Sequence, residues 1–424
     1  MLLSFKLRNS FSFANENILD MRATKIKAHD YSLLGEGNNK VLPVMSIYGA
    51  NASGKSNLIR SLLYMLELIA SGRRIRVWPF MLNEFILDDE PTMPPAFELT
   101  FLLNQDEYTF TIMPANGEHY FESLFYRTGA KGRSKLVYKR EWNGKAEKWT
   151  LKLGTTLTEA DKSLIDEISY VDSMERGNKT LLLYALCNRK QHVMFSAIAK
   201  WVANFNTSRY AGKNATAGGT LKTHAKNPHL KYFTHENTKK KVLEFVQSLN
   251  PHIKDYDFEA MEREAVQGQD TTERYQLFFE YGNQNAFAGK KVMDVDRIIS
   301  VYESRGVYSA FTLIPTILKA LESGGLIVID EIENSLHPLL MARVVNMFTD
   351  PETNIGGGQL IFTTHNALIM DKKYLRQDEI AFVEKNEEGK SELYKLSDID
   401  GVRSDLDFCK NYILGAFGAV PNFE

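Results

Sequence analysis

The sequence GANASGKS at residues 49–56 constrains the fold of this chain more than any other feature. It fits the phosphate-binding pattern G-x-x-x-x-G-K-[S/T] at each fixed position. Glycines let such a loop curl around a phosphate without Cβ clashes, so that consecutive backbone N–H groups face the anion. We therefore predict a nucleoside triphosphate site made by the loop and the residue after it: Gly49, Ala50, Asn51, Ala52, Ser53, Gly54, Lys55, Ser56 and Asn57.

The residues on either side of this loop predict a strand before it and a helix after it. Val44–Tyr48 is a short apolar run typical of a buried strand, and apolar residues recur at helical spacing from Leu58 to Ile69. A helix that begins at the loop directs its positive N-terminus toward the phosphates. We expect Lys55 to reach the β- and γ-phosphates and the Ser56 hydroxyl to ligate Mg²⁺. A chance match in a glycine-containing turn is the alternative, and the flanking pattern argues against it.

A second apolar run ends in two carboxylates. Leu326–Ile329 reads as a buried parallel strand and is followed directly by Asp330 and Glu331. We expect Asp330 to hold Mg²⁺, directly or through water, and Glu331 to orient or deprotonate the attacking water. Taken alone, the run would be more typical of a strand that ends in a solvated acidic turn. The phosphate loop elsewhere in the chain favours the catalytic interpretation.

Two further features extend the predicted site. Gln359–Thr364 reads as a strand that ends at His365, and ligands of open α/β sheets bind at the carboxyl ends of strands. His365 is thus a candidate contact of the γ-phosphate, although a lone histidine is more often structural. Ser304 and Gly306 open another predicted helix, where they form either a second anion site or an ordinary helix cap.

Length and composition indicate a water-soluble protein of two or three domains. The chain has 424 residues, of which 44% are hydrophobic and 25% charged, as in ordinary globular proteins. Its two cysteines, Cys187 and Cys409, lie far apart without metal-ligand spacing. We therefore expect neither a disulfide framework nor a zinc site, in agreement with a cytoplasmic location. No signal peptide is evident, and no apolar run of about 18 residues predicts a membrane span.

Hydrophobic periodicity divides the chain into three predicted regions. Residues 1–150 hold the phosphate loop and several strands, with a predicted hairpin formed by 97–103 and 107–112. Residues 151–294 read as a mainly helical insertion, and Thr158 with Asp161 resembles the cap of its first helix. Residues 206–228 lose apolar periodicity and predict a long loop. Residues 295–424 carry the second half of the nucleotide site.

Positive charge is concentrated in a basic segment, residues 189–241. Eleven Lys or Arg and a single acid give it a formal charge of +10, whereas the whole chain carries −2. Clustered cations with interleaved aromatics are typical of a nucleic-acid surface. The alternatives are a solvated face and a surface that pairs with an acidic protein. The candidate contacts are Arg209, Lys213, Lys222, Lys226, Lys239, Lys240 and Lys241.

The order of these motifs resembles that of the ABC-type ATPases of the SMC/RecF kind. Within them the chain is similar to the bacterial RloA/AbiLi-type ATPases, relatives of the OLD nucleases. The resemblance is carried by residues 49–56, 303–306 (ESRG), 326–338, 359–366 and 412–421 (YILGAFGAVP). It implies an α/β fold: an ABC-type P-loop ATPase head with a mixed sheet, an N-terminal antiparallel β subdomain and a mainly helical insertion.

The resemblance also implies roles for individual residues. Ser304 and Gly306 would belong to the signature motif, which contacts ATP bound on the opposite subunit, and His365 would be the switch histidine. Two ATP molecules would then lie between two heads, in a homodimer or a higher homo-oligomer. Val307 stands where the family usually has Thr, and the Q-loop glutamine expected near residues 80–83 is not evident. Both departures favour slow turnover.

Three functions are consistent with these sequence features. The resemblance implies a cytoplasmic, Mg²⁺-dependent ATPase that acts as the sensor or regulator of an anti-phage defence system. Its effector would be a separate, nuclease-like chain, because the residues after His365 are too few for the nuclease domain of OLD proteins. A DNA-maintenance ATPase of the RecF kind, with the basic segment on DNA, is the first alternative. A scaffold that binds ATP with little turnover is the second.

Overall fold

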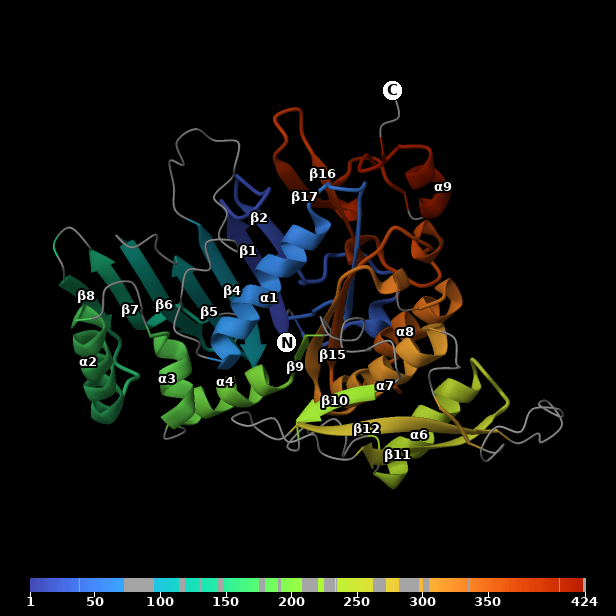
Figure 1. Ribbon diagram of the computed structural model, residues 1–424. Helices are drawn as coiled ribbons and strands as arrows, with labels where there is room; N and C mark the ends of the chain where they lie inside the picture. The colour runs from blue at the N-terminus through green and yellow to red at the C-terminus, as the bar shows by residue number, and fades with distance from the viewer. Residues whose placement is uncertain are drawn as a thin grey trace.

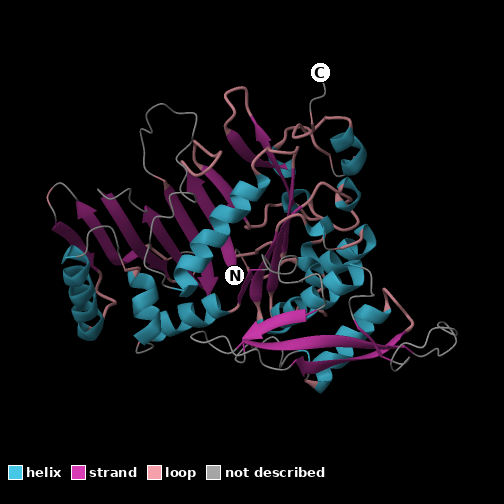
Figure 2. Ribbon diagram, in the orientation of Figure 1, coloured by secondary structure: helices cyan, strands magenta, loops and turns pink. Residues whose placement is uncertain are grey.

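The computed structural model describes residues 1–37, 39–71, 95–113, 119–129, 132–143, 146, 148–174, 180–189, 192–207, 220–224, 233, 235–261, 272–281, 297–299, 305–334, 336–403 and 405–421. Within these residues the strands form a seven-stranded, a six-stranded and a four-stranded sheet. Helices lie between and beside the sheets, as Figures 1 and 2 show.

The seven-stranded sheet is antiparallel throughout, in the order β2-β1-β4-β5-β6-β7-β8. The predicted hairpin is confirmed as β4 and β5. Its two-residue turn has positive φ at Asn104 (49°) and Gln105 (68°), the conformation that matches the twist of the paired strands. The strands are β1 Leu2–Arg8, β2 Asn17–Asp20, β4 Ala96–Leu103, β5 Asp106–Met113, β6 His119–Arg127, β7 Lys135–Asn143 and β8 Lys148–Leu153.

The six-stranded sheet contains the strand that leads into the phosphate loop. Its order is β17-β16-β3-β15-β14-β9, and all its strands are parallel except β17, which pairs antiparallel with β16. Both faces are covered, because alternate residues of β3 belong to two different cores. The strands are β3 Val44–Tyr48, β9 Phe205–Thr207, β14 Gly325–Ile329, β15 Gly358–Thr363, β16 Ile380–Lys385 and β17 Ser391–Lys395.

Helix α1 (Lys55–Ser71) lies between these two sheets (Figure 1). Its apolar residues share one core with the seven-stranded sheet and with one face of the six-stranded sheet. The same core includes residues of α2 (Glu159–Met174), α3 (Leu182–Arg189) and α4 (Val193–Ala203). The predicted cap of α2 is confirmed: Thr158 N donates to Asp161 Oδ2 at 2.9 Å, and Asp161 N donates to Thr158 Oγ1 at 3.2 Å.

A second core covers the other face of the six-stranded sheet. It includes α6 (Glu236–Gln247), α7 (Arg305–Ser323), α8 (Pro338–Thr349) and α9 (Phe408–Ile413). The ring of Phe311 on α7 contacts Phe233 (4.9 Å) and Tyr256 (4.8 Å), which attaches the four-stranded sheet to α7. That sheet has β10 Thr220–His224, β11 Ile253–Met261, β12 Thr272–Tyr281 and β13 Arg297–Ile299. The 3₁₀ helices are η1 Asp30–Ser32, η5 Ile332–Asn334, η6 Ala367–Ile369, η7 Gln377–Glu379 and η8 Leu396–Asp398.

The predicted α/β class is confirmed by these sheets and helices. One expectation for the insertion differs from the structure. Residues 206–228 were predicted as a loop, yet β9 ends at Thr207 and Thr220–His224 forms β10. Both strands pair with segments far along the chain, β14 and β12, so local periodicity does not reveal them. The three-region division remains a prediction. Among the described helices, none has both the length and the hydrophobicity to cross a membrane.

Candidate functional site

The phosphate loop leaves the end of β3 and curls into α1. Its backbone has positive φ at Gly49 (153°), Ala52 (62°) and Gly54 (118°). A Cβ on Gly49 would lie 2.2 Å from the Val383 carbonyl oxygen, and one on Gly54 would lie 2.4 Å from Ser391 Oγ. Both glycines are therefore required by the close approach of the β16–β17 hairpin as well as by the curl itself.

Lys55 lies folded into the loop and is only 5% exposed. Its Nζ donates to the carbonyl oxygens of Gly49 (2.8 Å) and Ala50 (3.0 Å). Burial lowers the pKa of Lys55, and the negative charges of Glu333, Asp330 and Glu331 act in the opposite direction. The lysine is thus a buried cation facing three acids.

The loop and the end of β14 meet at Asp330. Ser56 Oγ donates to Asp330 Oδ1 at 3.2 Å, and Thr363 Oγ1 donates to the same oxygen at 2.7 Å. The three residues come together because β3, β15 and β14 are parallel neighbours whose carboxyl ends share one edge. The predicted pair Ser56 and Asp330 therefore lies at one place.

The pair fits Mg²⁺. A hydroxyl and a carboxylate oxygen at this spacing suit a hard cation, which usually keeps several waters and takes other ligands from phosphates. Among the described residues, no group of three or more His, Cys, Asp or Glu side chains could hold a metal ion. The protein would therefore supply only part of the coordination shell.

Glu331 has a left-handed backbone, with φ of 53°. Its N–H donates to Thr363 Oγ1 at 2.7 Å, and its carboxylate accepts a hydrogen bond from Asn334 Nδ2 at 2.6 Å. Thr363, which is fully buried, thus fixes the turn through both acids, because its hydroxyl also donates to Asp330. Sequence reasoning missed Thr363, since a threonine in a strand is ordinary. It placed Asn334 in the stretch 326–338 that carries the resemblance, without assigning it a contact with Glu331.

Glu333 is a third acid of the turn that sequence reasoning missed. Its Oε1 accepts a hydrogen bond from the backbone N–H of His365 at 2.7 Å. Its Oε2 is buried and has no hydrogen-bond partner within the described residues. Among the acids whose charges act to raise the pKa of Lys55, Glu333 has the largest effect. The only sequence signal was a second glutamate two residues after Glu331. His365 itself is exposed at the end of β15.

The structure describes only some of the remaining predicted contact residues. Ser304 lies outside the described residues, and Gly306 lies in the first turn of α7. Arg209, Lys213, Lys226 and the Q-loop stretch at 80–83 also lie outside them. In the rest of the basic segment, Lys222 belongs to β10 and Lys240 is exposed. Lys239 and Lys241 form ion pairs with Asp255 (2.9 Å) and Glu322 (2.6 Å). Of the seven candidate nucleic-acid contacts, the described residues include Lys222, Lys239, Lys240 and Lys241, and a shared surface remains a prediction.

Solved structures similar to this chain are SMC head domains. The SMC head domain from Thermotoga maritima is 13% identical, with 93% of this chain and 98% of that chain covered and a TM-score of 0.41. The Smc head domain with a coiled coil and joint from Pyrococcus yayanosii is 10% identical, with 98% and 99% covered and a TM-score of 0.39. The SmcHead bound to the C-winged helix domain of ScpA is 14% identical, with 93% and 97% covered and a TM-score of 0.39.

A comparison with curated proteins finds no match. The family profile described as "AAA domain, putative AbiEii toxin, Type IV TA system" matches residues 44–371. The matched range includes the phosphate loop, the acidic turn after β14 and the histidine after β15. The described residues have the predicted α/β fold, with a mixed sheet that carries the phosphate loop and an N-terminal antiparallel sheet. This chain belongs to the AAA-domain family of putative AbiEii toxins.

Proposed function

We propose that this chain is a Mg²⁺-dependent ATPase of the RloA/AbiLi type whose heads dimerise around ATP and regulate a separate effector. The observation that carries the ATPase part is the hydrogen bond between Ser56 and Asp330 at the end of parallel strands. It joins the loop that would bind the phosphates to the acidic turn that would act on them, as phosphoryl transfer requires.

Each residue then has a definite role. The backbone N–H groups of the loop and the Lys55 ammonium bind the phosphate oxygens, which replace the carbonyls of Gly49 and Ala50 as acceptors for Lys55. Glu331 accepts the proton of the attacking water. Hydrogen bonds with Asn334 and Thr363 hold Glu331 in place. Mg²⁺ bound by Ser56 and Asp330 would neutralise charge on the phosphates.

Electrostatics supports the dimer. Lys55 faces Glu333, Asp330 and Glu331, so this half of the site carries more negative than positive charge before any phosphate enters. A bound triphosphate would need further positive groups around it. The N-terminus of α7, where Gly306 lies, provides backbone N–H groups and a positive dipole end. A second copy of the chain would present this helix end across the nucleotide.

The decisive variant is Glu331→Gln, measured for phosphate release and for oligomeric state by size-exclusion chromatography with MgATP. We expect turnover to fall by about 10²–10⁴-fold, while the variant still binds ATP and accumulates as a dimer. The control is Glu352→Gln, which replaces an exposed glutamate between α8 and β15 and should leave turnover and oligomeric state as in wild type. Unchanged turnover in Glu331→Gln would exclude the proposed base. Binding without turnover in the wild type would favour the scaffold alternative.

The regulatory part rests on the family, whose description names a toxin and a Type IV TA system. The chain would therefore act in defence through a partner, which we expect to resemble a nuclease. Affinity purification of tagged Glu331→Gln from its own host with MgATP should capture that partner in the closed state. Capture of the same partner by a Lys55→Ala variant would show that the interaction does not depend on nucleotide.

A DNA-maintenance role of the RecF kind is the alternative, and the described part of the basic segment supports it only weakly. Lys239 and Lys241 already form ion pairs with acids, although Lys240 and Lys241 are both exposed. Duplex DNA binding at low salt that is lost in a Lys239→Gln, Lys240→Gln, Lys241→Gln variant would favour this role. Absence of DNA binding at low salt would count against it.

A further inference from the structure

The outer side of the phosphate loop is held by residues from distant parts of the chain. Ser391, the first residue of β17, places its Oγ 2.5 Å from the carbonyl oxygen of Ser53. The same Oγ lies 2.7 Å from Ser12 Oγ, and Asn57 Nδ2 donates to Ser12 Oγ at 3.0 Å. These contacts join the turn after β1, the loop, the first turn of α1 and the start of β17.

The chemistry of these groups sets the direction of each hydrogen bond. The Ser391 hydroxyl is the donor toward both the Ser53 carbonyl and Ser12 Oγ, and the carbonyl oxygen is the nearer acceptor of its single hydrogen. Ser12 also accepts a hydrogen bond from the Asn57 amide. The Ser391 hydroxyl is therefore directed at the loop backbone. Ser391 is 1% exposed, so water does not compete for its hydroxyl.

The backbone around Ser391 fixes its position. Its N–H donates to the carbonyl oxygen of Ser12 at 2.7 Å. Ser12 itself lies in a tight turn closed by reciprocal backbone hydrogen bonds between Ser10 and Phe13, both at 3.0 Å. Ser391 Oγ also lies against Gly54, because a Cβ there would be 2.4 Å away. The hydroxyl is therefore held in place by backbone on either side.

A planar trans peptide points its C=O and its N–H in opposite directions. A Ser53 carbonyl held outward by Ser391 therefore turns the Gly54 N–H toward the concave side of the loop, where phosphates bind. We propose that Ser391 is a positioning residue of the nucleotide site, whose hydroxyl keeps the Ser53–Gly54 peptide in the orientation that binds phosphate.

This inference rests on the proposed nucleotide binding, and the test separates the two. Ser391→Ala is compared with wild type for MgATP affinity by titration calorimetry, for kcat and KM, and for melting temperature. Loss of one orienting hydrogen bond should weaken MgATP affinity about tenfold. KM should rise with kcat at saturating ATP nearly unchanged, because the peptide orientation acts on binding rather than on the attacking water.

The matched control is Ser10→Ala. Ser10 is also fully buried and also loses a hydroxyl contact, but that contact is 3.0 Å to Ser61 on α1, outside the phosphate loop. It should lower the melting temperature with wild-type affinity for MgATP. Equal weakening of affinity in both variants would overturn the positioning role in favour of general destabilisation. Wild-type affinity in Ser391→Ala would overturn it directly.

Ser12→Ala is the second variant, for use if Ser391→Ala does not fold. Ser12 is only partly buried, and its loss removes the second acceptor of the Ser391 hydroxyl, which leaves the Ser53 carbonyl as the acceptor. The proposal therefore requires an MgATP affinity at least equal to that of wild type. A weaker affinity in a folded Ser12→Ala variant would overturn it. A wild-type chain that does not bind MgATP would overturn the proposed function together with this inference.

Discussion

At the scale of single residues, the acidic turn after β14 separates two tasks between two glutamates. Glu331 is held by Asn334 and Thr363, whereas Glu333 accepts the N–H of His365 and keeps one buried oxygen without a hydrogen-bond partner in the described part of the chain. Glu333 thus connects the turn to the end of β15. The sequence DEIEN was enough to predict the base role of Glu331, but not the contact of Glu333 with His365, which depends on the pairing of β14 with β15.

We expect Glu333→Ala to lower kcat by about tenfold, because His365 loses the acceptor of its backbone N–H. Glu333→Gln retains a carbonyl acceptor at the same position and should stay closer to wild type. Steady-state phosphate release by the two variants makes the comparison. If Gln is as damaging as Ala, the negative charge of Glu333 is the property that matters.

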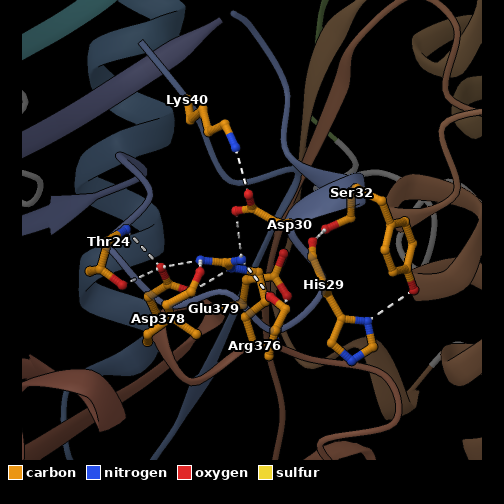
Figure 3. Close-up of polar contacts among 11 residues, drawn as sticks. Thr24, His29, Asp30, Ser32, Lys40, Arg376, Asp378 and Glu379 are labelled. Carbon is orange, nitrogen blue, oxygen red and sulfur yellow. Dashed lines mark hydrogen bonds and ion pairs between the residues drawn. The ribbon is translucent and has the colours of Figure 1, made fainter. Parts of the chain in front are cut away.

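Glu379 predicts how stability changes with pH. It lies in the cluster of Figure 3, is 1% exposed and accepts the N–H of Arg376 at 2.8 Å. Burial raises the pKa of its carboxyl from 4.5 to about 8. Since the folded pKa is the higher one, this group's stabilising contribution is complete below pH 4.5 and is lost as the pH rises toward 8.

Glu379→Gln removes that titration and keeps an acceptor for the Arg376 N–H. The melting temperature of wild type relative to this variant should therefore fall between pH 5 and pH 8, because in this range the folded chain keeps a proton on Glu379 that the unfolded chain loses. Differential scanning calorimetry at the two pH values gives the difference. A gap that does not change with pH would show that Glu379 is ionised in the folded chain throughout this range.

At the scale of elements, the segment between β2 and β3 is attached to the turn before β16 by a buried arginine (Figure 3). Arg376 donates to the carbonyl oxygens of Ala28 (2.5 Å) and Ile26 (2.9 Å) and to Asp378 Oδ1 (2.8 Å). Burial acts to raise the pKa of Asp378, but hydrogen bonds from Arg376 and Thr24 outweigh it and hold that pKa below its usual value. The cluster fixes β16 beside β3.

Arg376→Ala should destabilise the fold by about 3–5 kcal/mol, because it leaves the Asp378 carboxylate buried without its cation. Chemical denaturation measures the change in the free energy of unfolding. Arg403→Ala is the control, since the Arg403 side chain is 74% exposed in its pair with Asp405 and should change stability little. A small effect at Arg376 would mean that water reaches the cluster when the arginine is removed.

Local pattern predicts an element well when its signal is contained within the element. The alternation of β4 and β5, the apolar run of β14 and the Thr158 cap were all readable, and each depends on neighbours in sequence. Strand β10 could not be predicted from the sequence, because its partner β12 begins about fifty residues later. The same holds within the site: Lys55, Ser56 and Asp330 belong to motifs, whereas Thr363, Glu333 and Ser391 gain their roles from strand pairing.

At the scale of the whole molecule, the proposed dimer makes a prediction that no monomeric ATPase shares. Lys55→Ala and Gly306→Arg would each inactivate both sites of their own homodimers. Mixed in equal amounts, half the dimers would be heterodimers with one complete site, so about a quarter of wild-type activity should return. Phosphate release from the mixture, with both variants shown folded by circular dichroism, is the measurement. Activity no greater than that of the separate variants would exclude sites shared between two chains.

The order of strands in the six-stranded sheet has a consequence for how the protein is made. Strand β3 ends at residue 48, but its neighbours β15 and β16 begin at residues 358 and 380, and Ser391 follows later still. The seven-stranded sheet, in contrast, pairs strands mostly in the order of synthesis, so it can form early on the ribosome. A nascent chain would therefore carry an unsupported phosphate loop through most of translation, and its first nucleotide would bind only after these late strands had emerged.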